Sequence, residues 1–216
     1  MLKTTNTHKL WELALRDKHM MPAFGYGAAG TGKTYGAVGA AVDWLNDGKK
    51  NNVVLTRPNV VYADDIGFLP GTEEEKADPW IRPFRQNFLL HGIGKSHLED
   101  LQAKGRVKFQ TLAFVQGLTF DNTFIIVDEC QNLTFEQIKM LMTRVGNWTK
   151  IAFCGDTNQV SPKFRNSGLA EWLRMTKELD LPYHTIEFTH DDILRGDVCK
   201  QTIIACDKWE EMKCKR

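Results

Sequence analysis

The sequence at residues 27–34 is Gly-Ala-Ala-Gly-Thr-Gly-Lys-Thr, which matches the phosphate-binding pattern G-x-x-x-x-G-K-[S/T]. An apolar segment precedes it at 21–24, and a run compatible with a helix follows at 35–45. Glycines in such a loop let successive backbone N–H groups point toward phosphate oxygens, and the helix N-terminus adds a partial positive charge. The stretch therefore predicts a P-loop that binds a nucleoside triphosphate, rather than a glycine-rich turn without a ligand.

The motif assigns roles to single residues. Lys33 is expected to reach the β- and γ-phosphates, and the Thr34 hydroxyl is expected to ligate Mg²⁺. The rest of the loop supplies backbone N–H groups. The candidate nucleotide-binding residues are Gly27, Ala28, Ala29, Gly30, Thr31, Gly32, Lys33 and Thr34.

Two carboxylates stand at the end of a predicted strand at 123–128. Asp128 is placed to hold Mg²⁺ opposite Thr34, because magnesium prefers one or two carboxylates together with phosphate oxygens. Glu129, one residue further, is placed to orient and deprotonate an attacking water. The pair therefore favours hydrolysis over transfer of the phosphoryl group to a second substrate.

A third polar segment, Gly-Asp-Thr-Asn-Gln at 155–159, also follows an apolar strand. Asp156 and Gln159 should emerge at the same sheet edge as Lys33 and Asp128, where open α/β sheets place their ligands. Gln159 could hydrogen-bond the γ-phosphate or the attacking water. Without this context the segment would indicate only a turn.

Strands and helices alternate along the chain. Strands are predicted at 23–26, 53–56, 107–112, 123–128, 150–155 and 184–189, and helices at 10–18, 34–46, 81–90, 134–144, 168–179 and 198–212. This alternation predicts an α/β fold with a mostly parallel central sheet and helices on both faces. The run Phe-Ile-Ile-Val at 124–127 has no polar alternation, which indicates a central strand. A long loop is expected at 57–83.

Composition restricts the class of protein. The chain has 216 residues, 42% hydrophobic and 25% charged, which suits one packed domain over 1–216. Its formal net charge is +1, so no bulk charge indicates a nucleic-acid or membrane partner. No stretch is apolar enough to span a membrane, and the five cysteines are odd in number and lack a C-x-x-C pair. We expect a cytoplasmic protein with reduced thiols and no membrane partner.

Several further blocks accompany the P-loop. They are Thr-Arg-Pro at 56–58, Gly-Phe-Leu-Pro-Gly at 67–71, Asp-Glu-Cys-Gln-Asn at 128–132, Thr-Arg-Val-Gly at 143–146, Gly-Asp at 155–156 and Ser-Gly-Leu at 167–169. With them the chain resembles the PhoH-like ATPases from about residue 20 to its C-terminus. The Thr-Arg-Pro and Gly-Phe-Leu-Pro-Gly blocks are more diagnostic than the P-loop itself.

The resemblance implies a RecA-like P-loop NTPase core, related to superfamily 1 helicases, that uses ATP and Mg²⁺. It implies that the strand leading to Asp156 lies between the P-loop strand and the Asp128 strand. Tyr35 and Arg57 join the expected nucleotide-binding residues. The family is described as ATPases and candidate RNA helicases, and it resembles ring-forming hexamers. Some relatives carry a nuclease domain, and we expect none attached here.

Two positions depart from the family pattern. Family members usually carry Asn-Gln ahead of the P-loop, where the Gln resembles an adenine-reading residue, whereas the aligned region here is Asn-Thr-His at 6–8. His8 therefore leaves the selectivity for adenine open. Near the C-terminus, Val-Arg-His-Pro of the family is replaced by Leu-Arg-Gly-Asp at 194–197, which keeps Arg195.

Phosphoryl transfer commonly needs an arginine against the charge of the transition state, and a neighbouring subunit can supply it. The candidates are Arg195, Arg144 and Arg57. Arg195 is our first choice for a contact with the nucleotide, and Arg144 is the better choice for a contact across a ring. For each, the alternative is a surface arginine in an ion pair.

Three functions remain open. One is a motor acting on single-stranded RNA or DNA, gripped by Lys163, Arg165 and Asn166 in one loop and by Lys76, Trp80, Arg82 and Arg85 around another. The second is a nucleotide-gated oligomeric scaffold with incidental ATPase activity. The third is a small nucleotide kinase, which is disfavoured because Glu129 and Gln159 suit water activation and no arginine-rich lid follows the P-loop.

Overall fold

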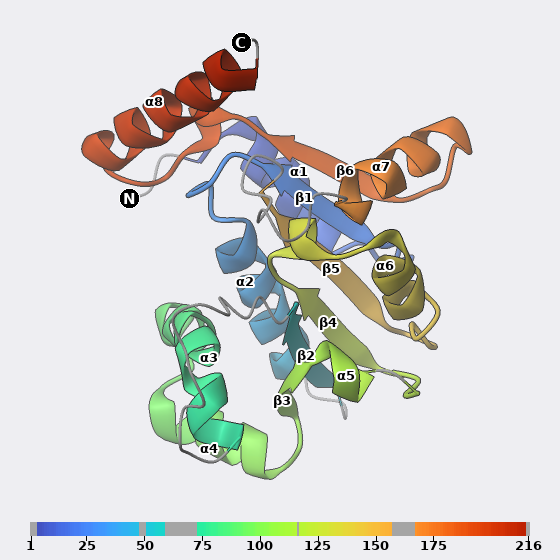
Figure 1. Cartoon of the computed structure of the whole chain (residues 1–216). Coiled ribbons are helices and arrows are strands. Elements are labelled where there is room, and N and C mark those ends of the chain that lie inside the picture. Colours follow the sequence, from blue (N-terminus) through green and yellow to red (C-terminus); the bar gives the residue numbers. More distant parts are fainter. Residues whose placement is uncertain (1–3, 48–50, 59–72, 116, 157–166, 215–216) are drawn as a thin grey trace.

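Six parallel strands form one sheet in the described part of the chain, in the order β3-β2-β4-β5-β1-β6 (Figure 1). This computed structural model describes residues 4–47, 51–58, 73–115, 117–156 and 167–214. The strands are β1 (Ala23–Gly27), β2 (Asn52–Arg57), β3 (Val107–Thr111), β4 (Thr123–Val127), β5 (Lys150–Gly155) and β6 (His184–Phe188). Tyr26 pairs with Gly155 and Val127 with Phe153, so β1, β4 and β5 end at the same edge of the sheet.

Helices cover both faces of the sheet. They are α1 (Asn6–Leu15), α2 (Lys33–Asn46), α3 (Glu73–Leu90), α4 (Lys95–Ala103), α5 (Leu112–Val115), α6 (Phe135–Met142), α7 (Gly168–Glu178) and α8 (Asp197–Cys214), with short 3₁₀ turns η1 (Cys130–Asn132) and η3 (His190–Asp192). Figure 1 shows α2 on one side of the sheet and α6 and α7 on the other, while α8 projects beyond the end of β6.

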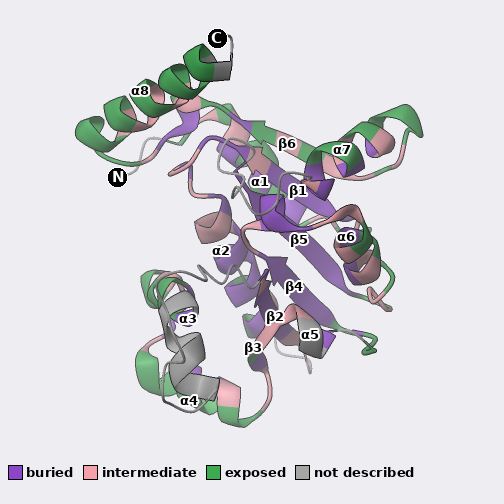
Figure 2. Cartoon of the chain, in the orientation of Figure 1, coloured by how far each residue is buried: buried purple, intermediate pink, exposed green. Residues whose placement is uncertain are grey.

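Two apolar clusters pack against the two faces. One contains Phe124 and Ile126 of β4 with residues of α1, α2, α3 and α4, and the other contains Ile125 and Val127 with residues of α5, α6 and α7. Every residue of β4 is buried, and the centre of the sheet is buried in Figure 2. Alternate residues of β4 thus pack into the cores on the two opposite faces. This packing holds β4 in place, and with it the position at which Asp128 follows the strand.

The expected layout is confirmed, with differences at several elements. β5 lies between β1 and β4, as the resemblance implied. The first helix begins earlier than expected, at Asn6, because Thr5 and His8 form a capping box. Two further helices, α4 and α5, were not predicted. The expectation of a loop throughout 57–83 is wrong, since α3 is helical from Glu73.

No helix in the described ranges is both long enough and apolar enough to cross a membrane.

Candidate nucleotide-binding site

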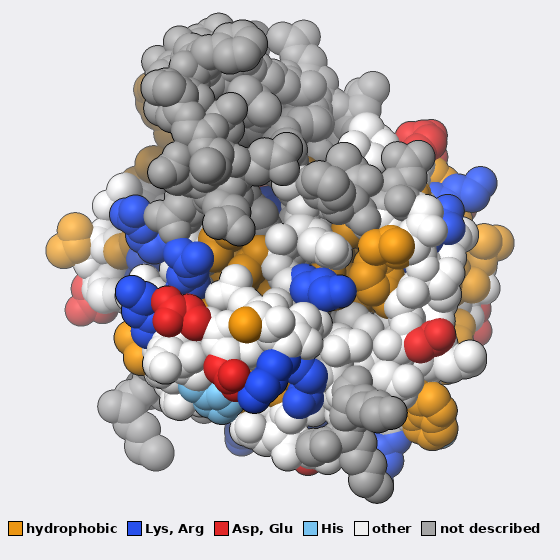
Figure 3. All heavy atoms as spheres, turned by 90° about the horizontal axis from the view of Figure 1, so that it is seen from below, with side chains coloured by type: hydrophobic (Ala, Val, Ile, Leu, Met, Phe, Trp, Pro, Cys, Tyr) orange, Lys and Arg blue, Asp and Glu red, His pale blue; other side chains and the backbone are white. Residues whose placement is uncertain are grey.

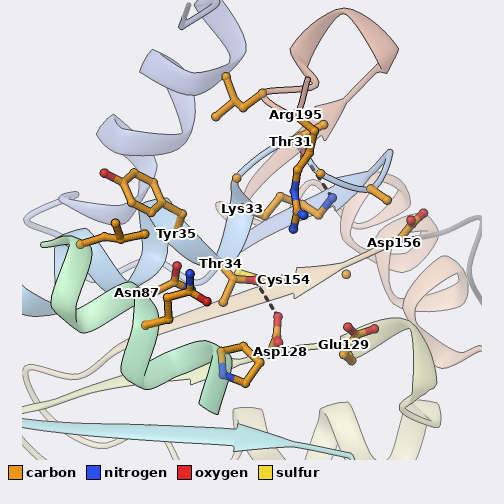
Figure 4. A pocket seen from close by; sticks show the side chains of 18 residues that line it. Thr31, Lys33, Thr34, Tyr35, Asn87, Asp128, Glu129, Cys154, Asp156 and Arg195 are labelled. Atoms are coloured by element: carbon orange, nitrogen blue, oxygen red, sulfur yellow. Dashed lines mark hydrogen bonds between the residues drawn. The ribbon is translucent and has the colours of Figure 1, made fainter. Parts of the chain in front are cut away.

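A cavity of about 540 Å³ opens at the carboxyl ends of β4 and β5, directly above the start of α2 (Figure 4). Its walls come from five parts of the chain that lie far apart in the sequence. The lining residues are Ala29, Gly30, Thr31, Gly32, Lys33, Thr34, Tyr35, Pro83, Gln86, Asn87, Leu90, Asp128, Glu129, Cys154, Gly155, Asp156, Leu194 and Arg195. The structure thus gathers most of the residues that the three sequence motifs predicted.

The backbone of the P-loop curls because glycines occupy conformations that other residues avoid. Gly27 has a φ of 107°, and a Cβ atom there would lie 2.1 Å from the carbonyl oxygen of Phe188. Gly32, with a φ of 81°, is the N-cap of α2. The N–H of Ala28 donates to the Phe188 carbonyl at 3.0 Å, which ties the loop to the end of β6. Gly27 and Ala28 therefore shape the loop without lining the cavity.

The Lys33 ammonium group is held by the loop itself. Its Nζ donates to the carbonyl oxygens of Gly27 at 2.9 Å and Ala28 at 2.7 Å, and it lies 3.2 Å from the Thr31 hydroxyl. Burial lowers the pKa of Lys33, while nearby Asp156 opposes that change. Contact with an anion stabilises the charged form of an ammonium group that is desolvated in this way, so the loop is suited to bind phosphate.

Thr34 and Asp128 meet at the foot of the cavity, where the Thr34 hydroxyl donates to Oδ1 of Asp128 at 2.7 Å (Figure 4). Burial, followed by the neighbouring carboxylate of Glu129, raises the pKa of Asp128 to about 6, although the Thr34 hydrogen bond opposes the rise. A buried carboxylate with this pKa is stabilised in its ionised form by a cation. The two predicted metal ligands are thus adjacent, and their oxygen atoms suit Mg²⁺.

Glu129 lines the cavity beside Asp128 and is fixed by two neighbours. Its backbone is left-handed, with a φ of 52°, which turns the chain sharply after β4. Nε2 of Gln131 donates to Oε2 of Glu129 at 2.7 Å, and a guanidinium nitrogen of Arg57 lies 3.7 Å from Oε1. Oε1 of Gln131 in turn accepts from the backbone N–H of Asp156 at 3.0 Å. Gln131 therefore links the ends of β4 and β5, a role that sequence analysis did not assign.

The predicted arginines fall in three different places. Arg195 lines the cavity and packs on the P-loop: a Cβ atom on Gly30 would lie 2.9 Å from Cγ of Arg195, and the N–H of Leu194 donates to the Gly30 carbonyl at 3.0 Å. Arg57 contacts Glu129 and is not among the residues that line the cavity. Arg144 follows α6 and lies near the start of β5, at the edge of the sheet opposite the cavity. Its backbone carbonyl accepts a hydrogen bond from the backbone N–H of Phe120 at 2.9 Å.

The structure brings Lys33, Thr34, Asp128, Glu129, Asp156 and Arg195 together and leaves Arg144 apart. Gln159 lies outside the described residues, as do the side chains of Lys76, Trp80, Lys163, Arg165 and Asn166.

His8, where the family resemblance expected a base-reading Gln, is a support for the P-loop. Its side chain is buried, and Nε2 lies 2.9 Å from the carbonyl oxygen of Thr31. Nδ1 lies 3.0 Å from the backbone nitrogen of Thr5, so Nδ1 accepts and Nε2 carries the proton donated to Thr31. The Thr5 hydroxyl donates to Asp192 at 2.5 Å. Both ring nitrogens are thus engaged by the protein, and α1, the P-loop and η3 are joined around His8.

One wall of the cavity was not predicted. Pro83, Gln86, Asn87 and Leu90 line it from the last turns of α3, and Figure 4 shows Asn87 at the same end of the cavity as Tyr35 of α2. The sequence predicted a helix at 81–90 and assigned Arg82 and Arg85 to nucleic acid, but it assigned no nucleotide contact to this helix. This wall depends on how two helices pack, and the clue in the sequence was Gly39, a small residue inside α2 where α3 comes close.

Comparison with known proteins agrees with this geometry. The model of the PhoH-like protein family matches residues 2–207. A PhoH-like protein of Bacillus subtilis (strain 168) is 41% identical over 187 residues, covering 86% of this chain and 58% of that protein. The protein PhoH of Escherichia coli (strain K12) is 32% identical over 195 residues, covering 89% of this chain and 54% of that protein. The chain thus spans just over half the length of these relatives.

Among solved structures, the large terminase of a thermophilic bacteriophage in complex with ADP aligns with a TM-score of 0.53 at 13% identity, covering 93% of this chain and 49% of that chain. A second crystal form of the same terminase gives a TM-score of 0.53 at 14% identity, covering 90% of this chain and 48% of that chain. Identity at this level shows the fold alone, which is a RecA-like P-loop fold, as the family resemblance implied.

Proposed function

The chain belongs to the PhoH-like protein family, and on that premise we propose that its cavity binds ATP with Mg²⁺ and hydrolyses the γ-phosphate. The observation that carries the proposal is the contact of 2.7 Å between the Thr34 hydroxyl and Asp128, beside the buried ammonium group of Lys33. A hydroxyl and a carboxylate at this position supply the oxygen ligands that Mg²⁺ takes next to a bound triphosphate.

The donor set fits magnesium. In the described ranges no three His, Cys, Asp or Glu side chains gather into a group that could hold a metal on their own. Mg²⁺ commonly keeps several waters and takes one or two protein ligands together with phosphate oxygens. Thr34 and Asp128 would hold the ion, which when bound neutralises charge on the β- and γ-phosphates. Lys33 would leave the carbonyls of the loop to bind the same phosphates.

We propose that Glu129 acts on the attacking water. Its carboxylate would accept a proton from that water while the water oxygen forms a bond to the γ-phosphorus. The bond from this phosphorus to the bridging oxygen breaks, so ADP and phosphate leave. Gln131 and Arg57 hold the carboxylate from behind, so it remains directed at the cavity. Arg195, which lines the same cavity, would meet the charge that develops on the phosphate oxygens.

We further propose that ATP turnover drives movement along single-stranded RNA or DNA. The support is α3, which carries both groups of residues. Arg82 and Arg85 are exposed on this helix, and Asn87 and Leu90 of the same helix line the cavity. A movement of α3 caused by the nucleotide would therefore also move the two arginines that we propose contact the polymer. On the face shown in Figure 3, the described Lys and Arg side chains are scattered among neutral and acidic ones. Such separate groups suit a sequence-tolerant grip on the phosphate backbone.

Assembly into a ring, hexameric as the family resemblance implied, would gather these groups around a pore. Arg144, at the opposite sheet edge from the cavity, is the proposed contact to a neighbouring subunit. In that arrangement the cavity of each subunit receives Arg195 in cis, and a second arginine from the next subunit completes the charge stabilisation.

The test is ATP hydrolysis at low salt with and without single-stranded RNA and single-stranded DNA. We expect stimulation by one or both polymers, loss of all activity in Lys33→Ala, and loss of the stimulation alone in the double variant Arg82→Ala and Arg85→Ala. Arg174→Ala, an exposed arginine on α7, is the matched control. A rate of hydrolysis that neither polymer raises would contradict the motor function and favour a nucleotide-gated scaffold.

A further inference from the structure

Tyr35 and His91 form a tilted aromatic pair beside the cavity. Their ring centroids are 4.2 Å apart with an angle of 32° between the planes. Nε2 of His91 lies 2.9 Å from the carbonyl oxygen of Tyr35, so this nitrogen donates the hydrogen bond. His91 thus contacts both the ring and the backbone of Tyr35, while the Tyr35 side chain also lines the cavity.

The His91 ring rests on Gly39, one turn further along α2. A Cβ atom on Gly39 would lie 2.7 Å from Cε1 of His91 and 3.1 Å from Nε2. Glycine inside a helix is unfavourable relative to alanine. The missing side chain at Gly39 therefore lets the imidazole ring of His91 approach α2 closely, next to Tyr35.

His91 also fixes the wall formed by α3. It follows the last residue of that helix, and its backbone N–H donates to the carbonyl of Asn87 at 3.1 Å. In Figure 4, Tyr35 and Asn87 lie at one end of the cavity, away from Asp156 and Glu129, with Lys33 and Thr34 between them. Phosphates at Lys33 and Thr34 would therefore leave the nucleoside at the Tyr35 end.

We propose that His91 is a positioning residue that holds Tyr35 as an aromatic platform for the nucleobase of the bound nucleoside triphosphate. The inference rests on the proposed function, because it presumes that the P-loop takes the phosphates. An aromatic ring accepts any base by stacking, and an aromatic partner held in place beforehand loses little freedom on binding. The amide of Asn87 faces the same end of the cavity, where it can meet polar edges of the base or the ribose.

The test compares ATP with inorganic tripolyphosphate, which carries the phosphates and lacks the nucleoside. Calorimetric titrations with Mg²⁺ would measure both dissociation constants for wild type, Tyr35→Ala, Tyr35→Phe and His91→Ala. His97→Ala, an exposed histidine on α4, is the control. We expect Tyr35→Ala and His91→Ala to weaken ATP by roughly 10-fold or more, from the loss of one stacking contact, and to leave tripolyphosphate within about twofold. Tyr35→Phe should retain ATP binding.

The outcomes separate the two levels of the argument. An unchanged ATP affinity in His91→Ala would overturn the positioning role. Equal weakening of ATP and tripolyphosphate would also overturn it, because the variant would then have damaged the P-loop. Wild-type protein that binds neither ligand would overturn the proposed function itself. Thermal denaturation of each variant keeps these results apart from loss of folding.

Discussion

Replacement of His8 tests whether the P-loop depends on a residue outside its own motif. His8→Leu places an apolar side chain of comparable size in the buried site and removes both ring hydrogen bonds, at 2.9 Å to Thr31 and 3.0 Å to Thr5. Each buried hydrogen bond contributes about 1 kcal/mol net, and an unpaired buried carbonyl adds to the loss. Thr31 is fully buried, so we expect the free energy of unfolding to fall by roughly 2–3 kcal/mol.

The effect on the ligand is worked out from the same contacts. The Thr31 hydroxyl lies 3.2 Å from Nζ of Lys33, so displacement of Thr31 would disturb the ammonium group that we propose binds phosphate. We expect weaker binding of ATP and of tripolyphosphate alike, in contrast to the Tyr35 variants.

Urea denaturation with and without MgATP measures both quantities, and a loss of this size should also lower Tm by roughly 5–10 °C. Lys9→Leu, at the adjacent exposed position on α1, is the control. Wild-type stability together with wild-type ATP affinity in His8→Leu would refute the reasoning.

Three further predictions concern other parts of the site and the sheet. Lys150 is buried, donates to a backbone carbonyl, and has its pKa lowered by burial to about 8; Lys150→Met should therefore stabilise the protein at pH 7 by up to about 3 kcal/mol in urea denaturation. Gly27→Ala should lower Tm sharply, because its φ of 107° and a carbonyl 2.1 Å from the new Cβ atom cost about 3 kcal/mol or more. Arg57→Gln should slow ATP hydrolysis by roughly 10-fold by releasing Glu129, with less than about 1 kcal/mol lost in stability because the pair is partly exposed.

The sign of the Lys150 effect follows from proton linkage. The unfolded chain holds the lysine proton up to about pH 10.5, while the folded chain releases it near pH 8. The stability of the wild type should therefore rise between these values, and the advantage of Lys150→Met should shrink over the same range. An advantage that is independent of pH would contradict this account.

The controls for the other two variants are also in the chain. Gly94 has a φ of −65° and open space around its Cβ position, so Gly94→Ala should stay within about 1 kcal/mol of wild type. Equal losses in Gly27→Ala and Gly94→Ala would contradict the steric argument. For Arg57, a large loss of stability without a change in the rate of hydrolysis would show that it supports the fold and does not orient Glu129.

The strands and the phosphate end of the site could be predicted from sequence because their determinants are local. The run at 124–127 is apolar at every position, as expected of a strand buried on both faces, and the carboxylates follow at its end. The P-loop could likewise be predicted, since its glycines, Lys33 and Thr34 lie within eight consecutive residues.

At the Tyr35 end of the cavity the resemblance gave only Tyr35 itself, and the wall formed by α3 could not be predicted, because its determinants are contacts between distant segments. The prolines, glycines and acidic residues at 57–83 favoured a loop, whereas α3 is helical from Glu73. α4 contributes only Leu98 and Leu101 to the core, so its apolar periodicity is weak. His91 becomes relevant only once Gly39 of α2 lies beneath it.

The most direct measurement of the central claim is single-turnover hydrolysis of MgATP by wild type and Glu129→Gln, with ATP affinity measured in parallel. Glutamine keeps the shape of the side chain and removes the base. The account predicts ATP affinity within about threefold of wild type and a rate of hydrolysis lower by roughly 10²–10⁴-fold. Hydrolysis by Glu129→Gln at the wild-type rate would contradict the assignment of Glu129 and with it the proposed mechanism.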